Sequence, residues 1–258
     1  MKRVVAEMAM VLVTGGTGTL GSALVPRLVA RGHDVRVLTH HRSADFPPAV
    51  RVVRGDVRSS TDIAEAVAGV EVVVHAATSP FRRAKATELE GTRAVLAAAG
   101  SVGAHFVYPS IVGVDRLSGT YYQAKSKAEN IVEAASHWSI QRATQLHPTL
   151  NQMVSHRLFP VTSHLAFQPL DAGDFAESLI RLVEGGPAGR TEDFGGPEVL
   201  TLREIVAARR AVINRRTTLI RVPAVGPLRT LDAGRQLCPD HARGRVTWHQ
   251  WLEDQSRS

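Results

Sequence analysis

The chain has 258 residues, a formal net charge of +7 and a single cysteine, Cys238. This length favours one domain with a modest appendage, and a single cysteine excludes an internal disulfide and fits a reducing cytoplasm. Apolar runs in the sequence are too short to cross a bilayer. Residues 1–9 are expected to form an N-terminal extension that lacks a secretory hydrophobic region.

The positive charge does not by itself indicate a nucleic-acid ligand. Arginines are spread along the chain, and the longest local clusters are the pairs at 209–210 and 215–216, without interleaved aromatic residues. The histidines are scattered and lack the spacing of zinc ligands. We therefore expect no nucleic-acid partner, no membrane partner and no metal. An anionic cofactor or substrate is the expected use of part of this charge.

The segment MVLVTGGTGTLG, residues 10–21, joins a short apolar strand to an amphipathic helix over residues 19–31. Gly15 permits a sharp turn out of the strand, and Gly18 lets a pyrophosphate approach the backbone. Gly21 lets the helix lie close to the strand, and the helix N-terminus points at the phosphates. This pattern predicts a dinucleotide site, and the alternative is an ordinary glycine turn.

A second strand over residues 34–39 completes a β-α-β unit, and the residues at its end predict the cofactor. An acidic residue there would accept a hydrogen bond from the ribose 2′-hydroxyl and repel a 2′-phosphate. The chain instead has Thr39, His40 and Arg42, with no carboxylate before Asp45. Arg42 can clamp a phosphate with two hydrogen bonds, and Thr39 and His40 can donate to it. NADP(H) is therefore preferred over NAD(H), and the alternative is a solvated basic loop.

The following elements alternate between strands and helices. Strands are expected at residues 51–53, 71–75, 105–108 and 140–146, and helices at 61–68, 83–99 and 121–136. This alternation predicts an α/β fold, a Rossmann-type doubly wound parallel sheet with helices on both faces. Residues 10–148 would form the NAD(P)-binding domain, and residues 149–258 a small C-terminal substrate-binding region that contributes back to the main sheet.

The C-terminal region carries two helix-start signals. Asp174 is a candidate cap for a helix over residues 175–184. Thr201 and Glu204 have the spacing of a capping box and predict the start of a second helix. The prolines in this region interrupt the pattern, and its residues show no motif of known chemistry.

Tyr121 and Lys125 have the spacing of neighbours on one face of a helix. A nearby ammonium favours the phenolate form of a tyrosine, which suits proton transfer. The lysine can also bind the ribose hydroxyls of a cofactor. The alternative is a surface pair on an amphipathic helix, and the position of the pair, one helix after the fifth strand of a nucleotide-binding sheet, favours the catalytic interpretation.

The sequence resembles the short-chain dehydrogenase/reductase superfamily, in its atypical and extended branches with NmrA-like and NAD-dependent epimerase-like members. The segments that carry the resemblance are TGGTGTLG at 14–21, GDV at 55–57, HAAT at 75–78, EGT at 90–92, FVYPS at 106–110 and YYQAK at 121–125. The resemblance is good over about residues 10–148 and fainter in the remainder. It implies a Rossmann domain with a small C-terminal substrate region.

The resemblance also implies roles for individual residues. Gly15, Gly18 and Gly21 would line the pyrophosphate, with Thr17, Thr19 and Leu20 beside it. Asp56 and Val57 would flank the adenine, and Ala76, Ala77 and Thr78 would pass along the ribose. Pro148 would pack near the nicotinamide. Tyr121 would be the general acid/base, with Lys125 as its partner.

Two positions depart from the family pattern. Ser110 lies where a hydroxyl usually orients the substrate oxygen, but in the paired-serine arrangement the working position falls on Ile111. Ser110 is therefore either the orienting hydroxyl or a residue of the turn at the strand end. Glu88 stands where an asparagine is common, three residues before the Gly-Thr pair, so a proton relay built on that asparagine is in question.

These observations predict an NAD(P)H-dependent oxidoreductase that reduces a carbonyl or an activated double bond of a small organic molecule. Two alternatives stay open: an NmrA-like NADP(H)-binding redox sensor without turnover, and a sugar-nucleotide epimerase or dehydratase, for which the C-terminal region offers little room. His147 and His156 are alternative proton donors. A cytoplasmic monomer or homodimer is expected.

Overall fold

The computed structural model describes residues 8–40, 45–79, 85–214 and 216–257. The chain forms two compact units, and each unit is made of several separate segments of the sequence. Unit 1 comprises Met1–Pro109, Ala124–Gln141 and Ala176–Thr191, and unit 2 comprises Ser110–Gln123, Arg142–Phe175 and Glu192–Ser258. This division follows spatial packing, and the domain boundary expected after residue 148 stays a prediction.

Unit 1 is built on a seven-stranded sheet with the order β3-β2-β1-β4-β5-β6-β9. Its strands are β1 (Met10–Thr14), β2 (Asp34–Thr39), β3 (Arg51–Arg54), β4 (Val72–His75), β5 (His105–Ile111), β6 (Trp138–Ala143) and β9 (Gly189–Arg190). Strand β1 pairs in parallel with β2 on one side and β4 on the other, so the strand order reverses there. In doubly wound sheets this reversal is where ligands bind.

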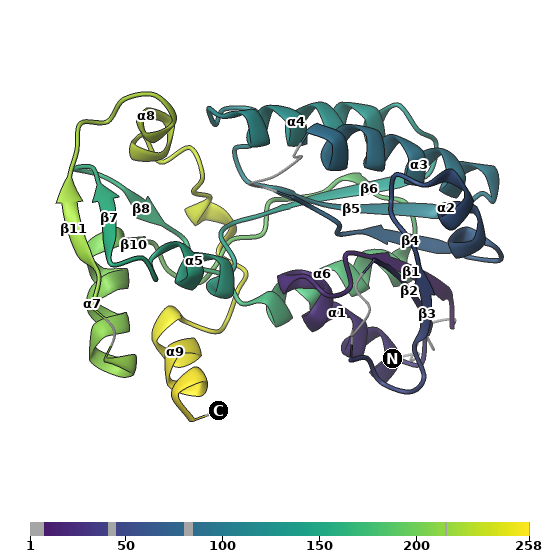
Figure 1. Cartoon of the computed structure of the whole chain (residues 1–258), viewed down its shortest axis with the longest axis horizontal. Coiled ribbons are helices and arrows are strands. Elements are labelled where there is room, and N and C mark those ends of the chain that lie inside the picture. The colour runs from purple at the N-terminus through teal and green to yellow at the C-terminus, as the bar shows by residue number, and fades with distance from the viewer. Residues whose placement is uncertain (1–7, 41–44, 80–84, 215, 258) are drawn as a thin grey trace. The chain divides into compact units, whose positions relative to one another are not determined.

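Helices cover both faces of this sheet (Figure 1). Helices α2 (Ser60–Val67), α3 (Thr92–Ser101) and α4 (Thr120–Glu133) lie on one face, and α1 (Thr19–Ala30) and α6 (Ala172–Gly185) on the other. The apolar strand residues predicted to be buried are buried: Val11, Leu12 and Val13 are 0% exposed. The Rossmann-type fold expected from the sequence is therefore confirmed.

Several expected elements differ in extent from those in the structure, and β5 (His105–Ile111) is three residues longer than the strand expected at 105–108. The strand expected at 140–146 is β6 at Trp138–Ala143, and the helix expected at 121–136 is α4 at Thr120–Glu133. The helix expected at 83–99 divides into a π-helix, η1 (Ala86–Gly91), and the α-helix α3, while residues 80–84 lie outside the described part of the chain. Sequence periodicity over so few turns does not distinguish a π-helix from an α-helix.

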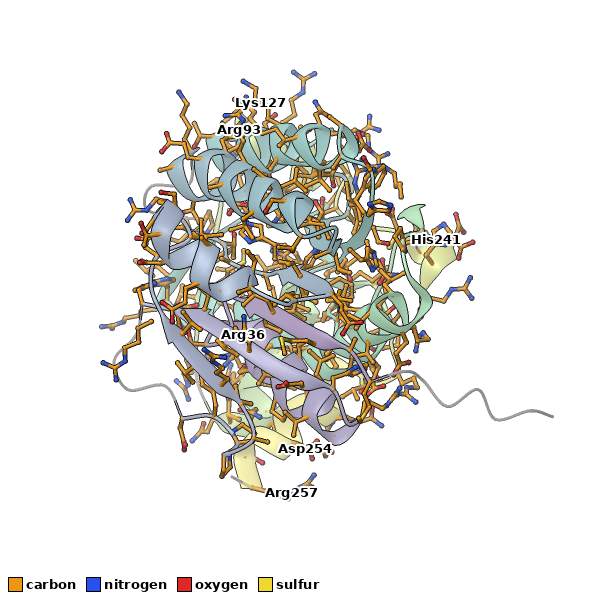
Figure 2. The ribbon with its side chains drawn as sticks, turned by 90° about the vertical axis from the view of Figure 1, so that its right-hand side faces the viewer. Arg36, Arg93, Lys127, His241, Asp254 and Arg257 are labelled. Atoms are coloured by element: carbon orange, nitrogen blue, oxygen red, sulfur yellow. The ribbon has the colours of Figure 1, made fainter. Side chains whose placement is uncertain are left out.

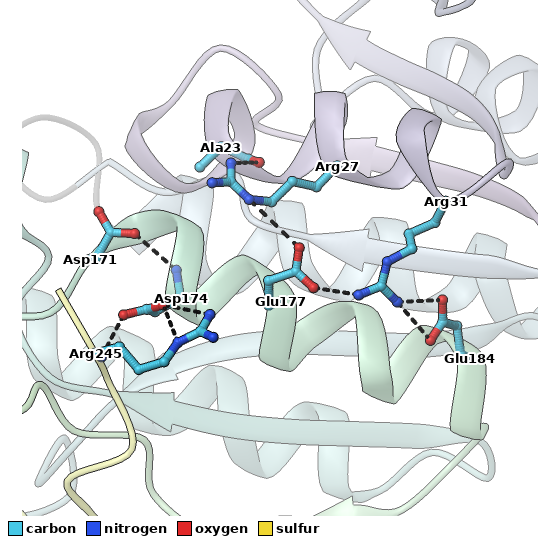
Figure 3. Close-up of polar contacts among 8 residues, drawn as sticks. All are labelled: Ala23, Arg27, Arg31, Asp171, Asp174, Glu177, Glu184 and Arg245. Atoms are coloured by element: carbon cyan, nitrogen blue, oxygen red, sulfur yellow. Dashed lines mark hydrogen bonds and ion pairs between the residues drawn. The ribbon is translucent and has the colours of Figure 1, made fainter.

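Arginines on α1 and acidic residues on α6 join the two helices that cover one face of the sheet (Figure 3). Arg31 lies 2.6 Å from Glu177 and 3.2 Å from Glu184, and Arg27 lies 3.8 Å from Glu177. Both arginines are partly exposed, so each pair contributes little stability on its own. Their arrangement instead fixes how α1 and α6 lie side by side.

Helix α6 begins two residues before its predicted cap, and the prediction that Asp174 caps it is wrong. Its first residue is Ala172, and Asp171 is the capping residue, because its carboxylate accepts a hydrogen bond of 3.0 Å from the Asp174 amide. Asp174 lies in the first turn and accepts a hydrogen bond of 2.6 Å from the Arg245 amide (Figure 3) and one of 3.1 Å from the Val246 amide. The sequence alone does not show which of the two aspartates, Asp171 or Asp174, caps the helix.

Arg36 is a buried arginine within the sheet, on strand β2 (Figure 2). Its guanidinium donates hydrogen bonds to the carbonyls of Ala66 at 2.6 Å and Ala68 at 2.9 Å. These carbonyls belong to the C-terminal end of α2, where helix acceptors lack partners within the helix. Arg36 thus caps the C-terminal end of α2 and attaches this helix to the sheet.

Unit 2 contains two small sheets and several helices. The strands are β7 (Leu158–Val161), β8 (Ala166–Phe167), β10 (Leu200–Thr201) and β11 (Thr218–Arg221), where β8 pairs with β10 and β7 with β11; the helices are α5 (His147–Met153), α7 (Leu202–Ile213), α8 (Pro227–Asp232), the 3₁₀-helix η2 (Pro239–His241) and α9 (Trp248–Arg257). The predicted capping box of Thr201 and Glu204 is confirmed at the start of α7. The fully buried Trp248 is part of the apolar core.

Among the helices that the structure describes, none has the length and apolar character needed to span a membrane.

Candidate functional site

The glycine loop between β1 and α1 lies at the reversal point of the sheet in unit 1. Gly15 has a φ of +72°, a conformation that side chains rarely adopt. A Cβ atom there would also lie 2.6 Å from the Ala77 nitrogen and 2.7 Å from the Ala76 carbonyl. The loop and the segment after β4 can therefore approach each other this closely only with glycine at position 15.

The other two glycines differ in their surroundings. A Cβ atom on Gly21 would lie 2.2 Å from the Gly15 oxygen, so this glycine lets α1 pack against the loop, as the sequence predicts. Among the described residues, a Cβ atom on Gly18 would lie within 4 Å of that same oxygen alone, at 3.2 Å. Gly18 is therefore less crowded than Gly15 and Gly21, and protein packing accounts for it as glycine less fully.

The N-terminus of α1 suits an anionic ligand. Gly18 is the N-cap residue and supplies no side chain to the free amides of the first turn, which carries no acidic residue. Thr17 and Gly18 are exposed, and Thr19 and Leu20 are partly exposed. Free amides and the positive end of the helix dipole together favour a phosphate at such a position. The residues present fit the pyrophosphate of a dinucleotide.

The residues expected to flank the adenine lie after β3. The Asp56 carboxylate accepts a hydrogen bond of 3.0 Å from Arg58, and this interaction is the main reason that the pKa of Asp56 lies below its ordinary value. Val57 packs against Gly91, where a Cβ atom would lie 3.1 Å from its Cγ2. Asp56 thus has an internal partner besides any ligand.

The residues expected to select the cofactor are only partly described. Thr39 is the last residue of β2 and is 5% exposed, while His40 is exposed. Arg42, the predicted phosphate clamp, lies outside the described residues. The preference for NADP(H) therefore stays a prediction.

A buried chain of hydrogen bonds fixes the segment that would pass along the ribose. The Thr14 hydroxyl lies 2.7 Å from His75 Nδ1, and the Thr92 hydroxyl lies 3.1 Å from His75 Nε2. Burial lowers the pKa of His75 to about 3, so the ring is neutral at neutral pH. Because His75 ends β4, this chain links β1, β4 and α3 directly before Ala76 and Ala77.

Lys125, on α4, points into unit 1 and is buried. Its Nζ atom lies 3.4 Å from the Glu88 carboxylate and 4.1 Å from the centre of the Tyr108 ring. The Glu88 side chain is 0% exposed, and its other carboxylate oxygen accepts a hydrogen bond of 2.5 Å from the Thr78 hydroxyl. The structure thus joins two predicted site residues, Lys125 and Thr78, through a residue to which the sequence assigned no role.

Glu88 could have been found from the sequence by one signal. It is the residue that replaces the expected asparagine, and a carboxylate with the same spacing from the Gly-Thr pair can form an ion pair where an amide cannot. Its burial depends on the π-helix η1, whose geometry the sequence does not indicate.

The other predicted catalytic residues lie in segments assigned to unit 2. Tyr121 is in the first turn of α4, one turn before Lys125, and is partly buried, with its ring 5.5 Å from that of Tyr122. Ser110 is near the end of β5 and is 5% exposed; its hydroxyl hydrogen-bonds to no group among the described residues. Pro148 occupies the first turn of α5, where proline is favoured.

The two histidines considered as proton donors have opposite environments in unit 2. His147 is 0% exposed, and its ring centre lies 5.7 Å from that of Trp248 and 5.6 Å from that of Trp251. Burial lowers the pKa of His147 to about 4, against the opposite effect of the nearby Asp171 and Asp174 carboxylates, so the ring is neutral at neutral pH. His156 is exposed. His147 is therefore a buried residue of the core of unit 2.

Acid is expected to destabilise the protein through this histidine. The unfolded chain binds a proton near pH 6.5 and the folded ring only near pH 4, so stability falls as the pH drops through this window. A tenfold difference in proton affinity between the two states corresponds to about 1.4 kcal/mol of stability. Urea unfolding at several pH values, followed by tryptophan fluorescence, measures the slope. His147→Gln should reduce the slope without abolishing it, because the buried His75 and His105 also have lowered pKa values, and His156→Gln should leave it unchanged; equal slopes in both variants contradict the prediction.

The chain matches the family model described as NAD(P)H-binding over residues 15–151, more than half of its length. It therefore belongs to this NAD(P)H-binding family. The matched region contains the glycine loop, Glu88, Tyr121 and Lys125.

Several curated proteins are similar in sequence. A (4-alkanoyl-5-oxo-2,5-dihydrofuran-3-yl)methyl phosphate reductase of Streptomyces griseus is 28% identical over 217 residues, which cover 80% of this chain and 74% of the reductase. A 3-beta-hydroxysteroid dehydrogenase of Mycolicibacterium neoaurum is 34% identical over 116 residues, which cover 40% of this chain and 32% of that protein. Uncharacterized mycobacterial proteins are 33% identical over 93 residues, and the match spans only 11% of their length.

Solved structures share the fold at low identity. The NADPH-dependent quinone oxidoreductase QOR2 of Escherichia coli, complexed with NADPH, has a TM-score of 0.76 at 14% identity and covers 95% of this chain and 99% of that one. The UDP-glucose 4-epimerase of Thermus thermophilus, complexed with NAD, has a TM-score of 0.74 at 19% identity and covers 96% and 99%. Identities this low support the fold alone.

Proposed function

We propose that the protein is an NAD(P)H-dependent oxidoreductase that reduces a carbonyl or an activated double bond of a small organic molecule. The observation that carries this proposal is the pair Tyr121 and Lys125, one turn apart on α4, with the lysine buried in the unit that holds the glycine loop. A phenol and an ammonium at this spacing are the groups required for proton transfer beside a bound dinucleotide.

The roles of the residues follow from their chemistry. The glycine loop and the N-terminus of α1 bind the pyrophosphate. Lys125 donates hydrogen bonds to ribose hydroxyls, and Ser110 donates its hydrogen bond to the substrate oxygen. Tyr121 gives a proton to that oxygen as negative charge develops on it. When bound, the reduced nicotinamide supplies the hydride.

NADP(H) is the proposed cofactor in preference to NAD(H). The support is chemical: the segment that follows β2 offers Thr39, His40 and Arg42 and no carboxylate before Asp45. Such donors suit a 2′-phosphate. The Streptomyces griseus reductase among the similar proteins agrees with reduction of a small molecule, and a cytoplasmic location is part of the same proposal.

One experiment tests the function and separates it from its main alternative. NADPH and NADH oxidation is measured against a panel of aldehydes, ketones and quinones, beside the affinities for NADPH and NADP⁺. We expect turnover with at least one class of acceptor and faster turnover with NADPH. Tight binding that discriminates strongly between NADPH and NADP⁺, without turnover on any acceptor, would contradict the proposal and support a redox sensor.

The sensor alternative has one structural observation in its favour. Glu88 forms an ion pair with Lys125, so part of the charge that would act on Tyr121 is neutralised. The epimerases among the solved structures are too distant to favour epimerisation of a sugar nucleotide.

A further inference from the structure

We propose that Glu88 is a positioning residue that holds Lys125 and Thr78 together for the cofactor ribose and keeps the lysine charged. This inference rests on the proposed binding of a dinucleotide to unit 1.

The first argument is how the Glu88 carboxylate divides its contacts. One oxygen, Oε1, accepts hydrogen bonds from the Thr78 hydroxyl at 2.5 Å and the Ser79 amide at 3.2 Å. The other, Oε2, lies 3.4 Å from Lys125 Nζ and 3.4 Å from the Tyr108 hydroxyl. Each oxygen therefore serves a different one of the two segments that would contact the ribose, and a shift of Glu88 would disturb both.

The second argument is burial. The side chains of Glu88 and Lys125 are 0% and 5% exposed, so water does not solvate either charge well. Hydrophobic residues of similar size would give comparable stability in most proteins, so a buried ion pair is weak evidence for a purely stabilising role. A buried ammonium without its counter-ion tends to lose its proton. Glu88 is thus what maintains the charged form of Lys125.

Of the charged and titratable groups that the structure describes around Lys125, Glu88 is the carboxylate that forms an ion pair with it. From β4, His75 is neutral, and from β5, Tyr108 is neutral because burial raises its pKa to about 12. On α4 itself, Tyr121 lies one turn before the lysine and Glu129 one turn after it. Glu129 lies 3.1 Å from Arg190, so its charge is already shared with that guanidinium.

The third argument is the backbone that presents Glu88. It lies within η1, a π-helix, and such turns are rare and occur frequently at functional sites. Glu90, in the same π-helix, is exposed, so the two carboxylates are on different faces of one element. Glu90→Gln is therefore a matched control for Glu88→Gln.

The test is the affinity for NADPH, measured by fluorescence titration from about pH 7 to about pH 9 for both variants and the wild type. We expect the ratio of the Glu88→Gln dissociation constant to that of the wild type to rise by about fivefold to tenfold over this range. The reason is that Lys125 loses its proton and the stronger, charge-assisted hydrogen bond with it. Glu90→Gln should keep a constant ratio. Comparing ratios removes the titration of the cofactor itself.

A background variant separates positioning from folding. In Lys125→Met, adding Glu88→Gln should produce no further pH dependence, because the titrating group is absent. Circular dichroism at each pH shows whether the variants are folded. If the ratio of the dissociation constants of folded Glu88→Gln and the wild type does not change with pH, this inference is overturned and the proposed function is not. Failure of the wild type to bind NADPH or NADH overturns the proposed function and this inference with it.

Discussion

Replacing Tyr121 by phenylalanine is expected to lower the turnover number by about 10²–10⁴-fold while NADPH affinity stays close to that of the wild type. The substitution removes one hydroxyl and keeps the ring, which is partly buried and lies 5.5 Å from the ring of Tyr122. The packing of the first turn of α4 is therefore preserved. Steady-state kinetics with the best acceptor, beside a cofactor titration, gives the two quantities.

The adjacent tyrosine supplies the control for this substitution. Tyr122 is in the same turn, and burial raises its pKa, which makes it a poor source of phenolate. We expect Tyr122→Phe to keep near-normal turnover. Turnover of Tyr121→Phe at the wild-type rate would show that the phenol has no catalytic role. Equal losses in the two variants would indicate that the tyrosine pair acts through packing.

The parts of the molecule that sequence predicted well are those governed by local rules. The turn at Gly15 requires a positive φ, and the contact at Gly21 requires the absence of a Cβ atom. Both demands act within a few residues, so the spacing of the glycines expresses them directly. The capping box of Thr201 and Glu204 is also local, and it too was predicted correctly.

The parts that sequence did not predict depend on contacts between distant segments. Asp171 and Asp174 are both plausible caps for α6. The structure decides between them because the Asp174 carboxylate accepts hydrogen bonds from the Arg245 and Val246 amides, which lie more than 70 residues later in the sequence. The arginine in the buried strand β2, Arg36, finds its acceptors on α2.

The candidate site shows the same division. The spacing of Tyr121 and Lys125 on one helix could be predicted, but the direction of the lysine could not. Lys125 faces Glu88, which is 37 residues earlier and lies in a π-helix that periodicity does not reveal. A buried ion pair between two elements requires knowledge of how the chain folds, and residue spacing alone does not contain it.

Replacing Gly21 by alanine is expected to destabilise the fold, whereas replacing Gly18 by alanine is expected to weaken cofactor binding. At Gly21 the new Cβ atom would lie 2.2 Å from the Gly15 oxygen and 2.6 Å from the Gly16 Cα, so α1 must shift away from the loop. Overpacking of this kind costs about 1–3 kcal/mol or more. At Gly18 the Gly15 oxygen, at 3.2 Å, is the one atom of the described residues within 4 Å, so we expect the fold to accept the methyl group once this oxygen moves by a few tenths of an ångström.

We therefore expect Gly21→Ala to lower the free energy of unfolding, and Gly18→Ala to leave it nearly unchanged while weakening NADPH binding by about tenfold or more. The methyl group at position 18 occupies space that a pyrophosphate needs to reach the backbone. Gly100→Ala is the control: it lies in α3, no atom of the described residues comes within 4 Å of its Cβ position, and alanine should stabilise that helix by about 0.5–1 kcal/mol. Urea unfolding and cofactor titration of the three variants separate the two effects. Wild-type affinity in a folded Gly18→Ala variant would contradict the placement of the cofactor pyrophosphate at the glycine loop, because a methyl group at position 18 would block its approach to the backbone.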